Sequence, residues 1–153
     1  MGVGRVIEWI RRKGLKWRLI KADIPTNRVS DAARFLRVHR SRIVKTIIVT
    51  DGEKYYAAII PGNRKLDVGK TSKLLGRRVR LATKEEVLEA TGYPAGGVPP
   101  VALPSGITVI MDKRLLDKDV VYGGGGGEDY LLEFNPRELV EEVKPLVADI
   151  SKK

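Results

Sequence analysis

The sequence has no cysteine and a single histidine, His39. Without cysteine there can be no disulfide framework, no thiol nucleophile and no zinc site built on thiolates. A serine-histidine triad would have to use His39, which lies in the basic segment "RVHRSR". We expect this histidine at the surface or facing RNA, because such a charged segment rarely enters a core. Any reaction is therefore expected to proceed without a histidine base.

The chain also lacks a long apolar run. No stretch of about 18 apolar residues is present, so the sequence predicts no transmembrane helix. The N-terminal "MGVGRVIEWIRRKG" is too charged for a secretory signal, which makes a cytoplasmic location the expectation. No repeat or linker interrupts the 153 residues, and this predicts one domain over residues 1–153.

Acidic residues are scarce in the first half of the chain. Residues 1–80 hold 21 Lys and Arg against 6 Asp and Glu, whereas residues 81–153 hold 8 against 13. The formal net charge of the whole chain is +10 at pH 7. A one-sided basic surface favours a polyanion as partner, most simply nucleic acid. The alternative is a basic surface that serves solubility and has no dedicated partner.

Hydrophobic periodicity predicts helices interspersed with strands. Two runs rich in β-branched and aromatic residues, 43–50 and 54–60, flank Asp51-Gly52, which predicts an antiparallel hairpin. Other strands are expected within 16–23, 77–81, 107–111, 119–123 and 128–134, and helices over 3–13, 31–38, 68–75, 84–91 and 136–143. The fold class that follows is α/β of the α+β kind. Its sheet should be mixed, largely antiparallel and curled towards a partial barrel, with helices around it.

Three helix starts carry capping residues. Ser30 is the expected cap of the second helix. Thr83 with Glu86, and Asn135 with Glu138, have the spacing of capping boxes. Gly92 is expected to end the helix that Thr83 begins.

The segment "PGNRKLDVGKT" resembles a phosphate-binding loop that opens a helix. Six residues separate Gly62 from Gly69, whereas that motif requires four. Nucleotide hydrolysis is therefore not predicted, although a helix start of this kind can attract a phosphate of nucleic acid.

Lys45 is a lysine within the apolar run "IVKTIIV". Strand alternation places it on the face of Ile43, Ile47 and Val49. Because an ammonium group is costly to bury, such a lysine either extends to the edge of the sheet or serves a pocket. The residues alone leave both alternatives open.

Two stretches concentrate glycine and proline. In "GYPAGGVPPV", Gly96 and Gly97 permit unusual dihedral angles, while Pro99 and Pro100 fix an extended path. We interpret this stretch as a shaped loop whose backbone holds a ligand, suited to an ammonium group that carbonyls can bind. The five glycines 123–127 are either a flexible connection or a surface from which side chains are excluded so that a ligand lies against the backbone.

Taken in order, these segments resemble the YbaK/ProX family of aminoacyl-tRNA deacylases, the editing domains related to the insertion in bacterial prolyl-tRNA synthetase. The resemblance covers about residues 28–144 and is carried by "VSDAARFLRV", "IVKTIIV", "IIPGNRKLD", "TGYPAGGVPPVAL" and "GGGGGEDYLLEFNPRELVE". It implies hydrolysis of misacylated tRNA, with small amino acids such as Ala or Cys on tRNA-Pro as the expected substrates. It also implies that neither a metal nor a cofactor is required. The acceptor end of tRNA is the expected partner, and prolyl-tRNA synthetase is a further candidate partner.

The same resemblance assigns site residues. Lys45 is the expected catalytic residue, with Thr46 beside it. The expected substrate-binding residues are Thr46, Gly92, Gly96, Gly97, Val98, Pro99 and Pro100, together with Gly124 and Gly125 of the glycine run. The alternatives are a non-catalytic tRNA- or RNA-binding module on the same fold, and a small-molecule hydrolase whose positive charge is incidental.

Overall fold

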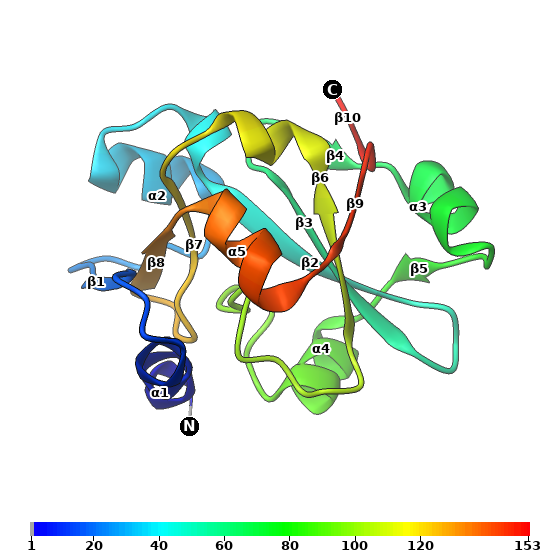
Figure 1. Ribbon diagram of the computed structural model, residues 1–153, viewed down its shortest axis with the longest axis horizontal. Coiled ribbons are helices and arrows are strands. Elements are labelled where there is room, and N and C mark those ends of the chain that lie inside the picture. Colours follow the sequence, from blue (N-terminus) through cyan, green and yellow to red (C-terminus); the bar gives the residue numbers. More distant parts are fainter. Residues whose placement is uncertain (1) are drawn as a thin grey trace.

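The computed structural model describes residues 2–153 (Figure 1). Its helices are α1 (Val3–Lys13), α2 (Val29–Leu36), η1 (Arg40–Arg42), α3 (Val68–Leu75), α4 (Lys84–Thr91), η2 (Lys113–Asp117) and α5 (Pro136–Val143), where η denotes a 3-10 helix. Its strands are β1 (Arg18–Lys21), β2 (Val44–Thr50), β3 (Tyr55–Pro61), β4 (Lys65–Leu66), β5 (Arg80–Leu81), β6 (Thr108–Asp112), β7 (Val121–Gly124), β8 (Tyr130–Phe134), β9 (Leu146–Ala148) and β10 (Ser151–Lys152). The predicted mixture of helices and strands is confirmed.

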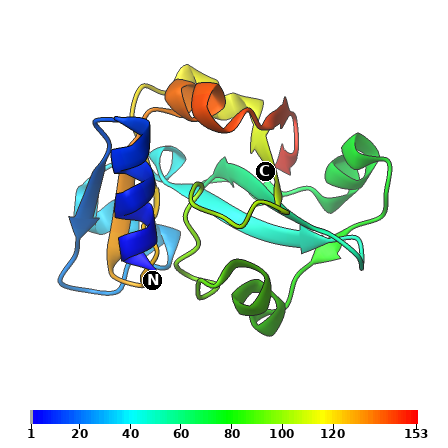
Figure 2. The same cartoon turned by 60° about the horizontal axis from the view of Figure 1, so that its bottom comes forward.

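The strands form three sheets. The largest has the order β5-β2-β3-β6-β9, a second has the order β1-β8-β7, and β10 pairs with β4. The predicted hairpin is present, since β2 and β3 pair antiparallel from Val44 opposite Pro61 to Thr50 opposite Tyr55. β3, β6 and β9 run parallel to one another, so the largest sheet is mixed. Figures 1 and 2 show the sheets side by side and not closed into a barrel.

The apolar residues of β2 divide between its two faces, as strand alternation predicts. Val44 and Ile48 belong to one buried cluster, which also contains Val98 of the Gly/Pro loop, residues 92–101. Val49 belongs to another cluster, and Ile47 packs against it. Lys45 shares this second face, so the face predicted for it is confirmed.

Helix ends follow local side-chain chemistry in most cases. The capping box of Thr83 and Glu86 is formed, and Gly92 ends α4 in the left-handed conformation with φ of 79°. Asn135 caps α5 by accepting a hydrogen bond from the Arg137 N–H. Glu138 does not complete a second box, because its carboxylate accepts from the Trp17 indole Nε1 at 3.0 Å instead.

The prediction for the start of α2 was wrong. The N-cap position is Arg28, and Ser30 lies inside the helix. No side chain makes a capping hydrogen bond there. The first turn of α2 therefore keeps backbone N–H groups without a side-chain acceptor.

The last residues of the chain add a strand to the largest sheet and then pair with β4. β9 extends that sheet beside β6, and β10 then pairs with β4 (Figure 1). These strands, and also η2, were not predicted. Within residues 2–153 no helix combines the length and the apolar character needed to span a bilayer.

Candidate active site

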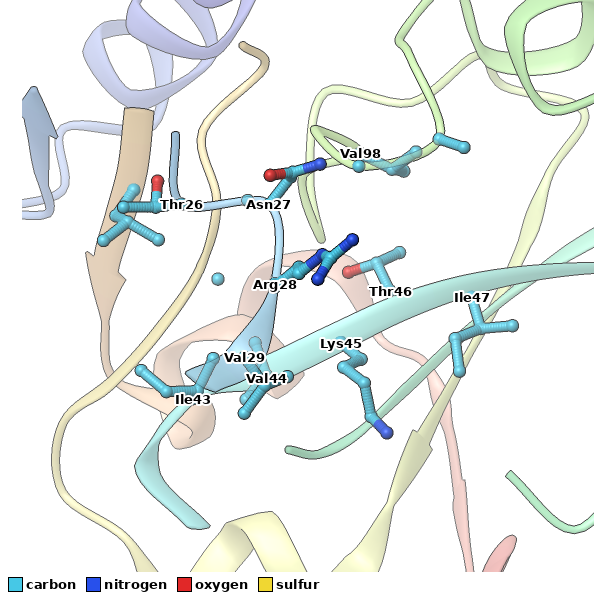
Figure 3. A pocket seen from close by; sticks show the side chains of 15 residues that line it. Thr26, Asn27, Arg28, Val29, Ile43, Val44, Lys45, Thr46, Ile47 and Val98 are labelled. Carbon is cyan, nitrogen blue, oxygen red and sulfur yellow. The ribbon is translucent and has the colours of Figure 1, made fainter. Parts of the chain in front are cut away.

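A cavity of about 190 Å³ opens beside β2, between the two larger sheets (Figure 3). Four parts of the chain surround it: the segment before α2, the first half of β2, the Gly/Pro loop, and the strands β7 and β8. It is lined by Thr26, Asn27, Arg28, Val29, Ile43, Val44, Lys45, Thr46, Ile47, Ala95, Gly96, Val98, Gly123, Gly124 and Leu131. The cavity thus exists only because segments distant in sequence come together.

The cavity coincides with a gap along the outer edge of β2. On this edge β5 pairs with only the last two residues of β2, and an isolated bridge joins Ile43 to β7. The Ile48 carbonyl accepts from the Ala82 N–H on the same edge at 2.9 Å. Backbone groups of alternate residues point to the same side of an antiparallel strand, so those of Thr46 face this edge too. A ligand in the cavity therefore meets a backbone donor and a backbone acceptor.

The hydroxyl of Thr46 also lies in this gap. Within residues 2–153 its Oγ1 is the buried side-chain polar atom that has no hydrogen-bond partner. Figure 3 shows it directed towards the guanidinium of Arg28. Leaving a buried polar group unpaired costs about 1–3 kcal/mol. A ligand that bonds to this hydroxyl would remove that cost.

Lys45 lies on the other side of β2 from Thr46 (Figure 3). Its Nζ donates a hydrogen bond to the Arg64 carbonyl oxygen at 2.6 Å. Burial, and in second place the positive charge of Lys65, lowers the pKa of the Lys45 ammonium. Lys45 is therefore a half-buried lysine at the cavity, held by a neutral acceptor.

Arg28 and Asn27 are cavity residues that the sequence analysis missed. The Arg28 guanidinium points into the cavity (Figure 3), and Asn27 packs so closely on Gly96 that a Cβ there would lie 2.6 Å from the Asn27 Cβ. Both residues precede α2, whose start was predicted at Ser30, so the segment before it received no role. The excess of arginine in this part of the chain was the available signal.

The Gly/Pro loop and the glycine run, residues 123–127, pack against each other through their backbones. The Gly126 N–H donates to the Gly97 carbonyl oxygen at 3.0 Å. A Cβ on Gly124 would overlap the Val98 carbonyl oxygen, and a Cβ on Gly97 would lie 3.2 Å from the Gly127 carbonyl carbon. Glycine is thus required because two backbones approach each other, and their contact forms one wall of the cavity.

The structure brings only part of the predicted site together. The residues that line the cavity are Lys45, Thr46, Gly96, Val98 and Gly124. The residues that do not reach its lining are Gly92, Gly97, Pro99, Pro100 and Gly125.

The predicted site residues that do not line the cavity are held in the structure around it. Gly92 ends α4, where a Cβ would lie 3.2 Å from Arg5 Nη1. Gly97 supports Gly124 from behind, and Gly125 donates its N–H to the Tyr130 carbonyl oxygen at 3.1 Å. Pro99 and Pro100 belong to the loop and are buried. Composition located the loop but could not separate the residues that face the cavity from those that hold the loop in place.

A second hollow of about 170 Å³ adjoins the cavity on the side of β5. The two share Thr46, Ile47, Ala95 and Val98, and the second is completed by Ile48, Leu81, Ala82 and Val87. Thr46 and Val98 therefore stand between two small spaces. Arg28 and Lys45 line one of them, with the Lys45 side chain directed to the opposite side of β2 from Thr46, and the other is mainly apolar.

His39 lies outside the lining of the cavity. It is exposed and caps η1, where its Nδ1 accepts from the Ser41 N–H at 3.0 Å. In the part of the chain that the structure describes, no three His, Asp or Glu side chains gather as candidate metal ligands.

Residues 24–142 match the model of the family described as the aminoacyl-tRNA editing domain. Every residue that lines the cavity falls within that range. The chain belongs to this family. The resemblance inferred from the sequence is thereby confirmed.

Relatives of this editing domain occur alone and inside larger proteins. The uncharacterized protein YwhH of Bacillus subtilis is 32% identical over 114 residues, which are 74% of this chain and 73% of YwhH. A proline--tRNA ligase of Solidesulfovibrio magneticus is 37% identical over 110 residues, which are 70% of this chain but 19% of the ligase. This chain thus corresponds to about a fifth of the length of such a ligase.

Solved structures share the whole fold of this editing domain. The hypothetical protein APE2540 is 52% identical, with a TM-score of 0.94 over 97% of this chain and 99% of that chain. A candidate trans-editing enzyme for prolyl-tRNA synthetase is 29% identical, with a TM-score of 0.91 over 99% of this chain and 98% of that chain. The mixed α/β architecture is therefore that of an editing domain.

Proposed function

We propose that the protein hydrolyses the ester that joins a wrongly attached amino acid to tRNA. Its expected substrates are small amino acids such as Ala or Cys on tRNA-Pro. Membership in the editing family supports the class of reaction. The observation that carries the proposal for this site is the unpartnered Thr46 hydroxyl at the open edge of β2, beside Lys45.

The cavity suits the end of an aminoacyl-tRNA. Its volume of about 190 Å³ corresponds to roughly six water molecules at about 30 Å³ each. With the adjoining hollow, there is space on both sides of Thr46 for an aminoacyl group and for the sugar that carries it. The Thr46 backbone N–H and hydroxyl are then donors for the ester or for the ribose.

The reaction needs positioning more than a strong base, because an aminoacyl ester is already activated. Water adds to the ester carbonyl carbon, the bond to the ribose oxygen breaks, and that oxygen leaves with a proton. Lys45 orients the carbonyl or the terminal ribose and stabilises the negative charge that develops on oxygen. Its ammonium has three N–H donors, so it can keep the Arg64 carbonyl as one acceptor while it donates to the substrate with another.

Size selects the substrate in this proposal. Val98 and Ala95 line the cavity with Thr46, and the close backbone contact of Gly124 with Val98 limits how far this wall can move. A pocket of fixed size admits small side chains and excludes the larger cognate proline, in the manner of a second sieve.

A basic band beside the cavity would hold the tRNA. It consists of Arg28 at the cavity, Arg34 on α2, Arg37 directly after α2 and Arg40 at the start of η1, all exposed. Within residues 2–153 none of the four forms an ion pair. Free guanidinium groups at a cavity mouth suit the phosphates of an acceptor stem.

The protein would act as one domain over residues 1–153 in the cytoplasm, where aminoacyl-tRNA is present. Prolyl-tRNA synthetase is the proposed partner, because proline--tRNA ligases contain a related segment.

The test is a panel of mischarged tRNAs, with Ala and Cys on tRNA-Pro first. We expect deacylation by the wild type and its loss in Lys45→Ala, which should keep a cooperative thermal transition. Binding of tRNA without hydrolysis of any ester in the panel would favour the non-catalytic RNA-binding module. Full activity of a folded Lys45→Ala would remove the proposed role of Lys45.

A further inference from the structure

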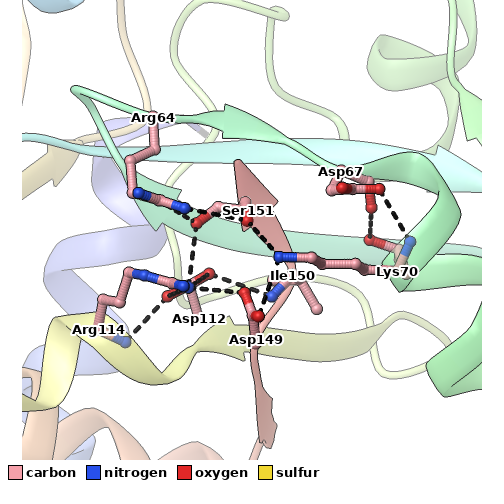
Figure 4. A network of polar contacts seen from close by, with 9 residues as sticks. Arg64, Asp67, Lys70, Asp112, Arg114, Asp149, Ile150 and Ser151 are labelled. Carbon is pink, nitrogen blue, oxygen red and sulfur yellow. Dashed lines mark hydrogen bonds and ion pairs between the residues drawn. The ribbon is translucent and has the colours of Figure 1, made fainter. Parts of the chain in front are cut away.

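A polar network fixes the end of the chain against β4 and β6 (Figure 4). Ser151 is fully buried. Its Oγ accepts from Arg64 Nε at 2.7 Å, and its carbonyl oxygen accepts from Arg64 Nη2 at 3.2 Å. The Arg64 side chain is thus held by both the hydroxyl and the backbone of one residue.

The same arginine holds the proposed catalytic lysine. The Arg64 carbonyl oxygen is the acceptor of the hydrogen bond from Lys45 Nζ, at 2.6 Å. The residues that follow Arg64 form β4, and there Leu66 pairs with Ser151. Ser151 therefore contacts Arg64 through its side chain and fixes the backbone two residues further on.

The remaining contacts of the network anchor this end of the chain independently of Arg64. Asp149 accepts from Arg114 Nη1 at 2.7 Å and from Lys70 Nζ at 2.9 Å. The Ile150 N–H donates to the buried carboxylate of Asp112 at 3.2 Å. These contacts keep Ser151 in place even when its own hydroxyl is removed.

We infer that Ser151 is a positioning residue for Lys45, acting through the Arg64 backbone. The inference rests on the proposed function, since it gives a reason for holding Lys45 still. Ser151 lies outside the range 24–142 that matches the family. The end of this chain would therefore contribute to an active site whose lining comes from elsewhere.

The first experiment measures the lysine directly and needs no tRNA. Hydrogen exchange of the Lys45 ammonium is followed by ¹⁵N NMR, with the signal assigned by its loss in Lys45→Ala. A net hydrogen bond of about 0.5–1.5 kcal/mol corresponds to roughly two- to tenfold in an equilibrium. We expect Ser151→Ala to accelerate exchange at Lys45 by about that factor.

The second experiment measures deacylation of a mischarged tRNA. In Ser151→Ala we expect kcat to fall by about two- to tenfold with little change in KM, because the lysine is less often in place while the tRNA-binding surface is intact. Ser151→Thr keeps the hydroxyl and should restore both kcat and the slow exchange.

Ile150→Val is the matched control. It removes one buried methylene from the adjacent residue and leaves every polar contact of the network unchanged. We expect its melting temperature to fall while Lys45 exchange and kcat stay at wild-type values. A merely structural role for Ser151 would make the two variants behave alike.

A double-mutant cycle with Arg64→Met tests whether Ser151 acts on Lys45 through Arg64. Both variants remove the bond from Arg64 Nε to the Ser151 hydroxyl, so the effects on Lys45 exchange that pass through this bond should not add. Ser151→Ala also loses the 3.5 Å contact with Arg114 Nη1, and Arg64→Met also loses the bond to the Ser151 carbonyl oxygen. Unchanged exchange in Ser151→Ala would overturn the inference while leaving the proposed function intact. Activity in Lys45→Ala would instead overturn the proposed role of Lys45, and a change in exchange would then have no catalytic meaning.

Discussion

Gly124 lies so close to Val98 that a single methyl group on Gly124 would overlap the Val98 carbonyl oxygen. The two residues belong to different segments and stand on the same wall of the cavity. Because Gly124 has no side chain, the Val98 backbone packs directly against it, and this contact fixes the position of Val98. This relationship makes the size of the cavity a consequence of backbone packing.

Gly124→Ala should consequently damage the site. Overpacking of this kind costs about 1–3 kcal/mol, and relief requires Val98 to move into the cavity. We expect deacylation to fall by about tenfold or more, with tRNA affinity within about twofold of the wild type. Gly97→Ala should act more mildly, since its Cβ would lie 3.2 Å from the Gly127 carbonyl carbon.

The control for Gly124→Ala is Gly106→Ala. A Cβ at Gly106 would have no neighbour within 4 Å, and its φ is not positive. Its activity and melting temperature should match the wild type. Equal loss of turnover and tRNA binding in Gly124→Ala would show general structural damage and no specific effect on the cavity.

Thr46→Val should separate stability from activity. The substitution replaces an unpaired buried hydroxyl by a methyl group of similar size, so the free energy of unfolding should rise by about 1 kcal/mol. Turnover should fall by about tenfold or more, because the substrate loses a donor. Chemical denaturation and single-turnover deacylation measure the two effects.

Thr50→Val on the same strand is the matched control, because it removes a hydroxyl that does have hydrogen-bond partners. The Thr50 hydroxyl donates to the Lys54 carbonyl oxygen at 2.8 Å and accepts from the Gly52 N–H at 3.0 Å. Its loss should destabilise the hairpin by about 1 kcal/mol without changing turnover. A destabilised Thr46→Val with normal turnover would mean that the hydroxyl serves folding alone.

Val98→Ala should relax the size limit. Val98 lines both small spaces beside Thr46. The substitution removes two methyl groups, and one methylene is worth about 10- to 200-fold in discrimination within an apolar pocket, so hydrolysis of cognate prolyl-tRNA relative to alanyl-tRNA should rise by about tenfold or more. Val101→Ala is a comparable change in the same buried cluster but outside the cavity, and its selectivity should be unchanged.

The basic band predicts the salt dependence of tRNA binding. Removing a phosphate contact lowers the slope of log K against log salt by about 0.7–0.9. Arg37→Gln with Arg40→Gln should therefore reduce the slope by about 1.5 and weaken binding at low salt. Arg11→Gln with Arg12→Gln removes two exposed charges from α1 and should leave the slope nearly unchanged. Identical slopes for both pairs would place the tRNA elsewhere.

Glu86 predicts how stability changes in acid. The Arg80 guanidinium, followed by the Thr83 N–H, lowers the pKa of Glu86 from 4.5 to about 2. Since the pKa is depressed in the folded state, the stability that this carboxylate contributes is present above pH 4.5 and is lost as pH falls towards 2. The melting temperatures of the wild type and Glu86→Gln should differ most near neutral pH and should converge as the pH falls from 4.5 towards 2. A constant difference across that range would contradict the assignment.

Local sequence signals predicted much of the fold. The hairpin around Asp51-Gly52 and the capping box of Thr83 and Glu86 depend on residues within a few positions of one another, and both are present. The face of Lys45 followed from alternation alone. The cap predicted at Ser30 was wrong, since α2 begins after Arg28 without a side-chain cap.

Contacts between distant residues could not be predicted in the same way. β4 and β10 have two residues each and exist only because they pair with each other. Arg28 enters the site because α2 begins beside β2, and Gly97 lies behind the wall because it meets Gly127. A single sequence carries no local pattern for these arrangements.

The open edge of β2 also bears on self-association. A strand edge with free N–H and C=O groups is a template on which another chain can add a strand. Here the opening is short, since β5 pairs at one end and the bridge at Ile43 closes the other. Arg28 and the Gly/Pro loop line the cavity at this opening. The opening along β2 is thus long enough for one small ligand but too short for a further strand to pair along it.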